Sequence, residues 1–254
     1  MKKSKFLEAA IRAAKEAGRI QEKNLGHIRK IEQKKSPSDL VTNVDKACEK
    51  KIISMLTKQF PEHSILSEEA GETKKSGEYE WVIDPIDGTD NYIMKLPLFA
   101  VSIALSCKGR VITGVCYFPM LKRMYYAEKG KGAYLNGKKI HVSGASLKKS
   151  RFFCSSSVHK SKTFFRNVKT LAFKVLKLRF LGSAVLNLVS VADGTTGLSI
   201  EYKIKPWDIA AASLIVEEAG GRVTDNRGNK WNMYNEYIVA TNGKIHNKVL
   251  KLIK

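Results

Sequence analysis

The sequence lacks the features of a membrane or secreted protein. Among its 254 residues, no apolar run approaches the roughly 20 residues that a membrane-spanning helix needs. Residues 1–18 start basic and soon mix Glu and Lys with alanines, so they lack the apolar core of a secretory signal. We therefore expect a soluble cytoplasmic protein with no membrane partner.

Cysteine and histidine are scarce and scattered. The four cysteines lie far apart, no C-x-x-C pair occurs, and the five histidines form no H-E-x-x-H motif. This spacing excludes the common zinc sites. The cysteines are therefore predicted to be reduced and mostly buried, at positions Cys48, Cys107, Cys116 and Cys154.

Acidic residues are few relative to basic ones. The chain has 45 Lys and Arg against 24 Asp and Glu, a net charge of +21, and residues 120–180 hold sixteen basic residues and one acid, Glu128. Such a field would attract nucleic acid or a polyphosphorylated substrate. No RNP motif, zinc finger or aromatic-basic array supports specific nucleic-acid recognition. We favour a solvated, lysine-rich surface over a nucleic-acid partner.

Hydrophobic periodicity predicts a mixed α/β protein. Apolar residues at helical spacing, with Thr42 or Asn43 as one N-cap, predict several helices. They are expected at residues 4–22, 44–60, 161–172, 183–194, 207–221 and 244–253. Runs rich in β-branched and aromatic residues predict strands. They are expected at residues 28–34, 63–72, 81–85, 97–107, 110–119, 123–130, 132–143, 151–157, 174–180, 197–202 and 236–242.

The order of these elements predicts a layered architecture. Helices come first, then a mixed sheet, then a second sheet-and-helix unit. The length fits one large domain or two closely joined subdomains. We also expect a polar loop at residues 36–45, a strand that stops at Pro85, and a two-residue hairpin at Asn136-Gly137.

One segment, WVIDPIDGTDNY, carries three aspartates at a spacing of three: Asp84, Asp87 and Asp90. Phosphatases of the haloacid dehalogenase type carry D-x-D-G-T, whose two aspartates lie two residues apart and so share one side of a strand. The spacing of three therefore argues against a nucleophilic Asp84. A second motif, GAYLNGKK, resembles a P-loop but ends in Lys where Ser or Thr is needed, and it lies in a predicted hairpin.

The aspartate spacing suits a metal ion better. A turn lets Asp84 and Asp87 converge and frees the carbonyl of Ile86 between them. Carboxylates and carbonyls are the oxygen ligands that Mg²⁺ prefers, at about 2.1 Å. Gly88 and Thr89 then begin a helical turn whose N–H groups can receive a phosphate. Taken alone, the segment is also compatible with an ordinary turn.

Two further acidic features accompany this segment. Glu68 and Glu69 are adjacent at the end of a predicted short strand, and Asp208 opens an apolar helix in WDIAAAS. Taken alone, Asp208 fits an N-cap and the two glutamates fit a solvated pair. In combination with the aspartate turn they acquire a more specific meaning.

The chain resembles the inositol monophosphatase family of Mg²⁺-dependent, lithium-sensitive phosphatases over nearly its whole length. The matching segments are SPSDLVTNVD, SEEAG, WVIDPIDGTDNYIMKLPLFAVSIAL, GKGAYLNGKKIHVS, LGSAVLNLVSVADG and WDIAAASLIVEEAGG. The resemblance implies the layered α-β-α-β-α sugar-phosphatase fold, an α/β fold with two mixed sheets, as a single domain over residues 1–254. Its subdomains are expected over about residues 1–145, for metal and phosphate, and 146–254, for substrate.

The resemblance also implies two to three Mg²⁺ ions, with Mn²⁺ as a substitute and Li⁺ as an inhibitor. One ion would be held by Glu68, Asp84 and the Ile86 carbonyl. A second would be held by Asp84, Asp87 and Asp208. Asp208 would in addition assist the leaving alkoxide through its metal and bound water.

A third, weaker ion is implied on the Glu68 side, near the loop at residues 34–39. Water rather than a side chain would attack phosphorus. The resemblance assigns its activation to the metal together with Glu68 and Thr89, with Asp45 accepting from the Thr89 hydroxyl. The N–H groups of Gly88 and Thr89 would hold the phosphate.

Positions that match polyol contacts in the family are Asp87, Gly182, Ser183, Ala184 and Glu201. A carboxylate such as Glu201 can accept hydrogen bonds from vicinal hydroxyls. Alternatively, Glu201 is an ordinary surface acid at the end of a strand. A small phosphorylated polyol or sugar is therefore the expected partner, and the resemblance also implies a homodimer.

The expected reaction is hydrolysis of myo-inositol 1-phosphate. Fructose 1,6-bisphosphate, alone or as a second substrate, stays open because a cationic rim would suit a second phosphate. Candidates for that rim are Lys174, Lys177, Arg179, Lys203 and Lys205. Phosphatases for 3′-phosphoadenosine 5′-phosphate or histidinol phosphate stay open too. The alternative of another class is a basic nucleic-acid-associated protein on this scaffold.

Overall fold

The computed structural model describes residues 3–34 and 40–253. Helices occupy seven segments of this part of the chain. They are α1 Lys5–Asn24, α2 Asn43–Gln59, α3 Thr89–Ile93, α4 Lys162–Ala172, α5 Ala184–Ala192, α6 Pro206–Glu218 and α7 His246–Leu252. Two short 3₁₀ helices add to them, η1 Leu147–Lys149 and η2 Ser156–Lys160.

The strands of the described residues form three sheets. The first is a small pair, β1 Ile31–Gln33 with β2 Leu40–Thr42. The eight-stranded sheet contains β10 Lys138–Lys139, β9 Ala133–Leu135, β8 Arg123–Glu128, β7 Arg110–Phe118, β6 Ala100–Cys107, β5 Tyr79–Asp87, β3 Ser64–Ser67 and β4 Gly71–Thr73, in this order. The five-stranded sheet contains β12 Lys177–Phe180, β11 Arg151–Cys154, β13 Leu198–Tyr202, β15 Tyr237–Thr241 and β14 Arg222–Asp225.

Both large sheets are mixed, as the sequence predicts. In the eight-stranded sheet β3 runs parallel to β5 and the other neighbours are antiparallel. In the five-stranded sheet β11 is parallel to β12 and β13, whereas β15 is antiparallel to β13 and β14. The predicted mixed sheets are therefore confirmed.

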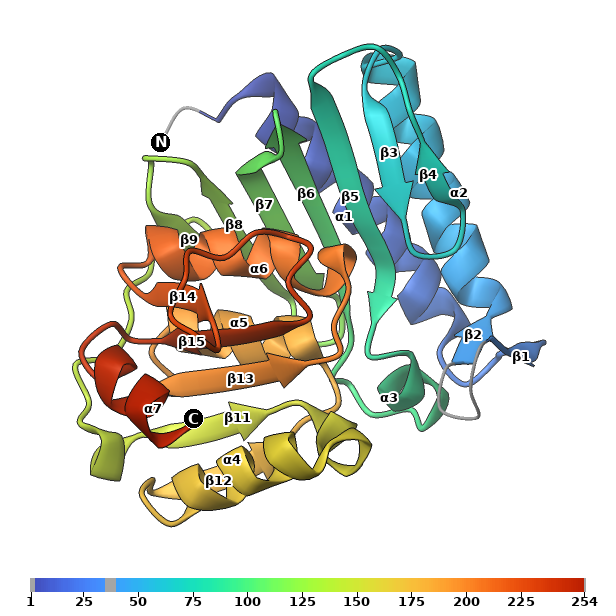
Figure 1. The fold of residues 1–254 in the computed structure, drawn as a ribbon. Coiled ribbons are helices and arrows are strands. Elements are labelled where there is room, and N and C mark those ends of the chain that lie inside the picture. The colour runs from blue at the N-terminus through green and yellow to red at the C-terminus, as the bar shows by residue number, and fades with distance from the viewer. Residues whose placement is uncertain (1–2, 35–39, 254) are drawn as a thin grey trace.

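The elements stack as α-β-α-β-α (Figure 1). Helices α1 and α2 cover one face of the eight-stranded sheet, and α5 and α6 lie between the two large sheets. Helices α4 and α7 cover the outer face of the five-stranded sheet. Each junction has its own apolar core, and the central one joins strands of both sheets through α5 and α6. The boundary near residue 145 between two subdomains stays a prediction.

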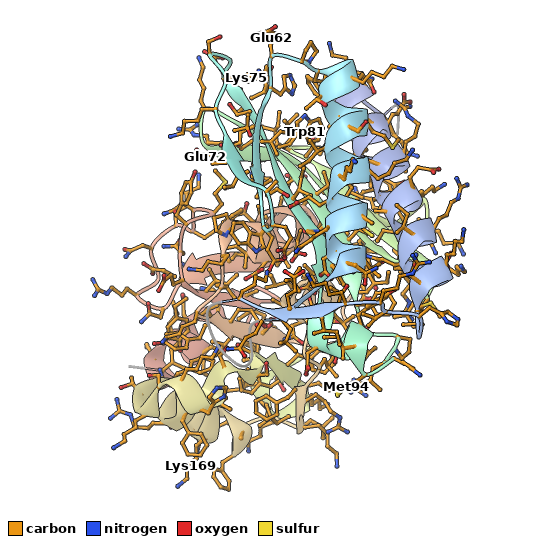
Figure 2. The ribbon with its side chains drawn as sticks, turned by 90° about the vertical axis from the view of Figure 1, so that its right-hand side faces the viewer. Glu62, Glu72, Lys75, Trp81, Met94 and Lys169 are labelled. Carbon is orange, nitrogen blue, oxygen red and sulfur yellow. The ribbon has the colours of Figure 1, made fainter. Side chains whose placement is uncertain are left out.

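Burial on both faces explains the apolar run in β5. Its residues from Trp81 to Asp87 are all buried, because helices cover the sheet on both sides. Figure 2 shows Trp81 on the inside beside α2, whereas Glu62, Glu72 and Lys75 lie at the outer edge of the molecule. The site described below grows from the end of this buried strand.

The prediction that this strand stops at Pro85 is wrong. Strand β5 continues to Asp87, with an irregular register: Asp84 pairs with Ser102 and Asp87 pairs with Ala100. Three residues of β5 thus span two residues of β6. Proline lacks an N–H for the ladder and is tolerated at such a bulge.

Other expectations need correction as well. Residues 40–42 of the predicted polar loop form β2, while residues 36–39 of that loop lie outside the described residues. The sequence patterns do not predict strand β14, nor β4 as a separate strand. The strand expected at residues 151–157 ends at Cys154 and passes into η2. Each difference involves a short element of three to five residues, whose composition is a weak signal.

Several local predictions are confirmed. Thr42 caps α2, with its hydroxyl 3.1 Å from the Val44 nitrogen. Asn136 and Gly137 both have positive φ and join β9 to β10, so GAYLNGKK is a hairpin. All four cysteines are free, and Cys107 alone among them is not fully buried. In the part of the chain that the structure describes, no helix is long and apolar enough to cross a membrane.

Close contact between α6 and β7 depends on Gly114. A Cβ atom at this position would lie 2.6 Å from the carbonyl oxygen of Ala211. We therefore expect Gly114→Ala to lower the free energy of unfolding by about 2 kcal/mol, which corresponds to a fall in Tm of about 5 °C. Thermal unfolding measures this. Gly144→Ala is the control, since its Cβ would have no neighbour within 4 Å. Equal stability of the two variants would contradict the prediction.

Candidate active site

The bulge at the end of β5 sets the orientation of two aspartates. In a regular strand, residues three apart face opposite sides of the sheet. The extra residue between Asp84 and Asp87 shifts this alternation, so both carboxylates can lie on one side. Each is buried, with exposed fractions of 2% and 6%. The negative charge of Asp87 contributes to raising the pKa of Asp84, after burial and the charge of Glu68.

Gly88 lets the chain turn sharply into α3. Its φ of 87° and ψ of 42° lie in the left-handed region, which side chains disfavour. A Cβ atom there would also meet the carbonyl oxygen of Leu98 at 3.0 Å. The turn exposes Gly88 and Thr89 at the wall of a pocket, where the sequence placed the phosphate.

Thr89 lines the pocket, and its hydroxyl is also hydrogen-bonded within the protein. Its hydroxyl lies 3.2 Å from Asp45 Oδ1 and 3.1 Å from the Ile86 carbonyl oxygen, and its single proton serves one of them. Asp45 is fully buried and also accepts from the hydroxyl and the backbone N–H of Thr42, at 2.5 and 2.9 Å. Burial raises the pKa of Asp45, and these bonds oppose the rise. The expected contact between Thr89 and Asp45 is therefore present.

Glu68 directly follows β3, and its backbone N–H donates to the Ile83 carbonyl of β5 at 3.2 Å. The Lys34 ammonium lies 2.7 Å from the Glu68 carboxylate and 2.6 Å from that of Glu69. Burial raises the pKa of Glu68 to about 8, against the attraction of Lys34. Glu49, which the sequence did not single out, accepts from the Glu69 N–H at 2.9 Å and fixes this corner.

Residues 35–39, near which a third ion is predicted, lie outside the described residues.

Asp208 lies in the first turn of α6, but it is not the N-cap that its sequence position alone suggested. Lys205 is the N-cap, and its backbone N–H donates to Asp208 Oδ2 at 2.7 Å. Burial raises the pKa of Asp208 to about 7; the Lys205 N–H opposes this rise and the charge of Asp87 adds to it. Helix α6, which lies between the two large sheets, thus places the Asp208 carboxylate within the electrostatic influence of Asp87.

These acids share one electrostatic field. The pKa of Asp84 is raised well above its ordinary value by burial, and then by the charges of Glu68, Asp87, Asp208 and Asp45. Buried like charges are costly unless a cation neutralises them, and an all-oxygen donor set suits a hard divalent ion. The donor chemistry therefore fits Mg²⁺, which Glu68, Asp84, Asp87, Asp208 and the Ile86 carbonyl would hold.

The types of donor atom fit Mg²⁺, but the described side chains are not arranged around a single ion. Among residues 3–34 and 40–253, no three His, Cys, Asp or Glu side chains already converge as ligands of one ion. Glu68 is instead bonded to Lys34, and Asp87 to the start of α5. The assignment of individual ligands stays a prediction.

The predicted substrate residues lie beside the acids. Asp87 accepts from the Ser183 hydroxyl and from the Ala184 N–H, the latter at 3.2 Å. Burial raises the pKa of Asp87 to about 7, and these bonds oppose the rise. Gly182 precedes this helix start and lines the same pocket wall. Glu201 comes from β13 and is buried, and its pKa is raised well above its ordinary value, mainly by burial.

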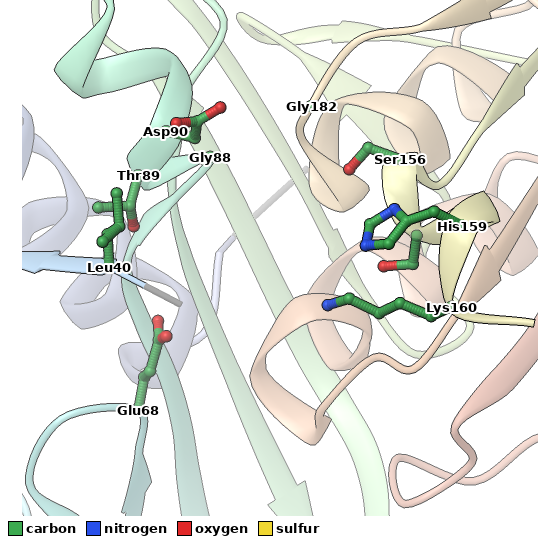
Figure 3. Close-up of a pocket in the computed structure, with 10 residues that line it drawn as sticks. Leu40, Glu68, Gly88, Thr89, Asp90, Ser156, His159, Lys160 and Gly182 are labelled. Atoms are coloured by element: carbon green, nitrogen blue, oxygen red, sulfur yellow. The ribbon is translucent and has the colours of Figure 1, made fainter. Parts of the chain in front are cut away.

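Two pockets adjoin at this site. The larger encloses about 370 Å³ between Glu68, Gly88 and Thr89 on one side and η2 on the other (Figure 3). The smaller encloses about 130 Å³ and includes Glu201 and Asp208. The two share Ser156, Ser157 and Gly182 in their linings. A phosphate in the larger pocket and a polyol in the smaller one would therefore be neighbours.

Sequence reasoning missed part of the lining. The missed residues are Asp90, Ser156, Ser157, His159, Lys160 and Asn187. The sequence analysis named Asp90 as the third aspartate of its segment but gave it no role. The serines follow β11 at its carboxyl end, where ligands bind in many α/β sheets, and the run CSSS was a usable signal. Asn187 gave no sequence signal, because it lies within an apolar helix.

Comparison with known proteins identifies the family. The model of the inositol monophosphatase family matches residues 2–254. This chain belongs to the inositol monophosphatase family. It is 36% identical over 248 residues to the fructose-1,6-bisphosphatase/inositol-1-monophosphatase of Thermotoga maritima, covering 97% of this chain and 95% of that protein. It is 40% identical over 246 residues to the Nus factor SuhB of Escherichia coli, covering 94% and 92%.

Solved structures agree with this inositol monophosphatase fold. The crystal structure of the extragenic suppressor protein SuhB from Bartonella henselae superimposes with a TM-score of 0.94 at 32% identity, over 99% of both chains. The chain is accordingly a phosphatase of small phosphorylated substrates, a hydrolase of phosphoric monoesters. Mg²⁺ dependence is general in the family.

The cluster of buried carboxylates predicts that one substitution lowers activity but raises stability. Asp84→Asn should lower phosphate release about 1000-fold or more, because it removes a central oxygen donor and charge. In chelator at pH 8 the same variant should be more stable than the wild type, by about 1–4 kcal/mol, because it removes a buried, repelled charge. Phosphate assays and urea unfolding measure the two effects. Glu72→Gln, an exposed acid of β4, is the control for net charge.

The stability gain should depend on pH. A raised pKa means that folded Asp84 keeps its proton in a range where the unfolded chain has lost it. The folded wild type is therefore destabilised as pH rises above about 4, the ordinary carboxyl range. The advantage of Asp84→Asn should be largest at pH 8 and shrink toward pH 4. If the stability advantage of Asp84→Asn instead grew as the pH fell, the conclusion that burial raises the pKa of Asp84 would be wrong.

Proposed function

We propose that this enzyme hydrolyses myo-inositol 1-phosphate to inositol and phosphate. The observation that supports this best is the small pocket that joins Glu201 to Asp208 and to the wall of the phosphate pocket. A buried carboxylate at this place favours a partner rich in hydroxyls over one with another anion. The substrate class beyond small phosphates is part of the proposal.

The phosphate would be held where Gly88 and Thr89 line the larger pocket. Backbone N–H groups at the turn donate to its oxygens. Asp87 cannot rotate freely, because Ser183 and Ala184 hold it, so it would keep one orientation during turnover. Asp208, held by the Lys205 N–H, would stand at the leaving-oxygen side.

We assign activation of the attacking water to Glu68 and Thr89. With its proton directed to Asp45, the Thr89 hydroxyl offers a lone pair to a water molecule in the pocket. The Glu68 carboxylate, on the same pocket wall, would accept a proton from that water. Bound Mg²⁺ would supply charge neutralisation and a water of lowered pKa. We propose two to three ions per site, Mn²⁺ as a substitute, and inhibition by Li⁺.

A substrate panel tests the proposal. Purified enzyme should release phosphate from myo-inositol 1-phosphate with Mg²⁺ and lose this activity in excess chelator. Adenosine 3′,5′-bisphosphate and histidinol phosphate should be cleaved at least tenfold less efficiently. A preference for either would replace the proposed substrate. Undiminished turnover in chelator would contradict the assigned role of the carboxylates.

Fructose 1,6-bisphosphate is a second candidate substrate. His159 and Lys160 of η2 reach into the larger pocket opposite Glu68 and Thr89 (Figure 3). The Lys160 ammonium suits the second phosphate, and the Thermotoga relative carries both activities in its name. Among the basic residues that the sequence suggested for this contact, Lys203 lines the smaller pocket.

We expect Lys160→Ala to reduce kcat/KM for fructose 1,6-bisphosphate about tenfold or more and to leave myo-inositol 1-phosphate within about twofold. The reason is that only the bisphosphate presents a second anion to η2. Lys169→Ala removes an equal charge from the outer face of α4 and serves as the control (Figure 2). Equal losses on both substrates would show that Lys160 does not read the second phosphate.

A homodimer and a cytoplasmic location complete the proposal. Exposed apolar side chains gather around α4 and β12, at Phe165, Phe173, Leu176 and Phe180. Such a surface commonly marks an interface. Light scattering should give twice the mass of one chain, and Phe173→Glu, at the most exposed of these positions, should weaken the dimer. A monomeric wild type at micromolar concentration would exclude it.

A nucleic-acid role is not proposed in place of catalysis. The net charge of +21 and a relative in Escherichia coli named Nus factor SuhB are the observations on that side. Glu68, Asp84, Asp87 and Asp208, however, are all present and share one field. A salt-sensitive shift of RNA without any phosphate release would favour the nucleic-acid alternative.

A further inference from the structure

Asn187 is a buried polar residue that the reaction described above does not use. It lies on α5, is 1% exposed, and lines the smaller pocket. Its amide nitrogen Nδ2 donates to Glu201 Oε1 at 2.9 Å. Its oxygen Oδ1 is buried and has no hydrogen-bond partner in the described part of the chain. An unpaired buried acceptor is costly, and beside a pocket it points to a ligand that donates to it.

Glu201 has a complementary arrangement. Ser199 Oγ at 2.5 Å and Asn187 Nδ2 at 2.9 Å both donate to the same oxygen, Oε1. Neither they nor any other described residue donates to Oε2. Because Glu201 Oε1 also accepts from the Ser199 hydroxyl, it acts as the acceptor for Asn187, which places Nδ2 toward Glu201 and Oδ1 away from it. The pair therefore offers two acceptors, Asn187 Oδ1 and Glu201 Oε2.

Two acceptors on residues joined by a hydrogen bond select the chemistry of the ligand. They match two hydroxyl donors of one molecule, and a vicinal diol carries two hydroxyls on adjacent carbons. A phosphate or carboxylate in this position would lie beside the carboxyl groups of Glu201 and Asp208, and when ionised it has no proton to donate to Asn187 Oδ1. An apolar group would leave both acceptors unpaired. Only the ammonium group of an amino alcohol competes on charge, and it would use Glu201 more than Asn187.

We propose that Asn187 is a specificity-determining residue: Nδ2 positions Glu201, and Oδ1 accepts a hydroxyl of the substrate, so that the pair reads a vicinal diol. This inference rests on the proposed function, because it places the polyol part of a phosphate ester in the smaller pocket. It assigns to α5 a direct share in the choice of substrate. The residue acts on the polyol and not on the phosphorus.

The test compares substrates with and without the diol. Asn187→Leu keeps the approximate size of the side chain and removes both polar atoms. It should lower kcat/KM for myo-inositol 1-phosphate about 100-fold, mainly through KM, and leave phenyl phosphate within about twofold. Deoxy analogues of inositol 1-phosphate that lack the recognised hydroxyl should lose activity with the wild type but show little further loss with the variant.

Ser199→Ala is the matched control. It removes the other donor to Glu201 Oε1 but contributes no acceptor to the pocket. It should therefore cost less than about tenfold on the diol substrate. Asn187→Ala provides a second variant if the larger leucine side chain impairs folding, which thermal unfolding would reveal. A loss on phenyl phosphate equal to that on inositol 1-phosphate would overturn the proposal, because it would show a structural role alone.

Failure of the proposed function is distinguishable from failure of this inference. If inositol 1-phosphate is not cleaved but another vicinal-diol phosphate is, the proposed function fails, and the ratio of that substrate to phenyl phosphate then decides the role of Asn187. If the wild type prefers histidinol phosphate, whose ammonium group would pair with Glu201, the diol inference is overturned. Retention of diol preference by both Asn187 variants would overturn it as well.

Discussion

The structure depends on keeping buried carboxylates close together against their mutual repulsion. Burial makes ionisation of these groups costly, and it raises the pKa of Asp84 together with the charges of Glu68, Asp87 and Asp208. The fold holds them by taking them from three rigid elements: the end of β3, the bulge of β5 and the first turn of α6. The site is thus an electrostatically costly arrangement that a bound cation would stabilise, and the surrounding apolar cores offset its cost.

Much of this arrangement could be predicted from the sequence, because its determinants are local. The three-residue step from Asp84 to Asp87 indicated a turn, and the structure realises it as a bulge. The cap at Thr42 and the Asn136-Gly137 hairpin also follow from short-range patterns, whereas the two mixed sheets are what the family resemblance implied. The resemblance to the inositol monophosphatase family then ordered these pieces in space and tied Asp208 to residues more than a hundred positions earlier.

The parts that could not be predicted depend on contacts with other elements of the fold. Pro85 reads as the end of a strand, and only the shifted pairing with β6 lets the strand continue. Strands β4 and β14 are short and form at sheet edges, where pairing rather than composition decides. Asn187 sits in an apolar helix, and its importance follows from Glu201 across the pocket. No periodicity marks a residue whose role is to contact another element's side chain.

One carboxylate near the site serves two purposes at once. Asp45 completes the capping box of α2 through Thr42, and the same side chain lies within hydrogen-bond distance of the Thr89 hydroxyl. The helix start and the proton position at the pocket are therefore not separable properties. Selection that relaxes catalysis would still preserve Asp45 for folding, so a member of the family that lost its activity could keep this residue. The presence of Asp45 in a sequence therefore indicates the fold and does not by itself indicate catalytic activity.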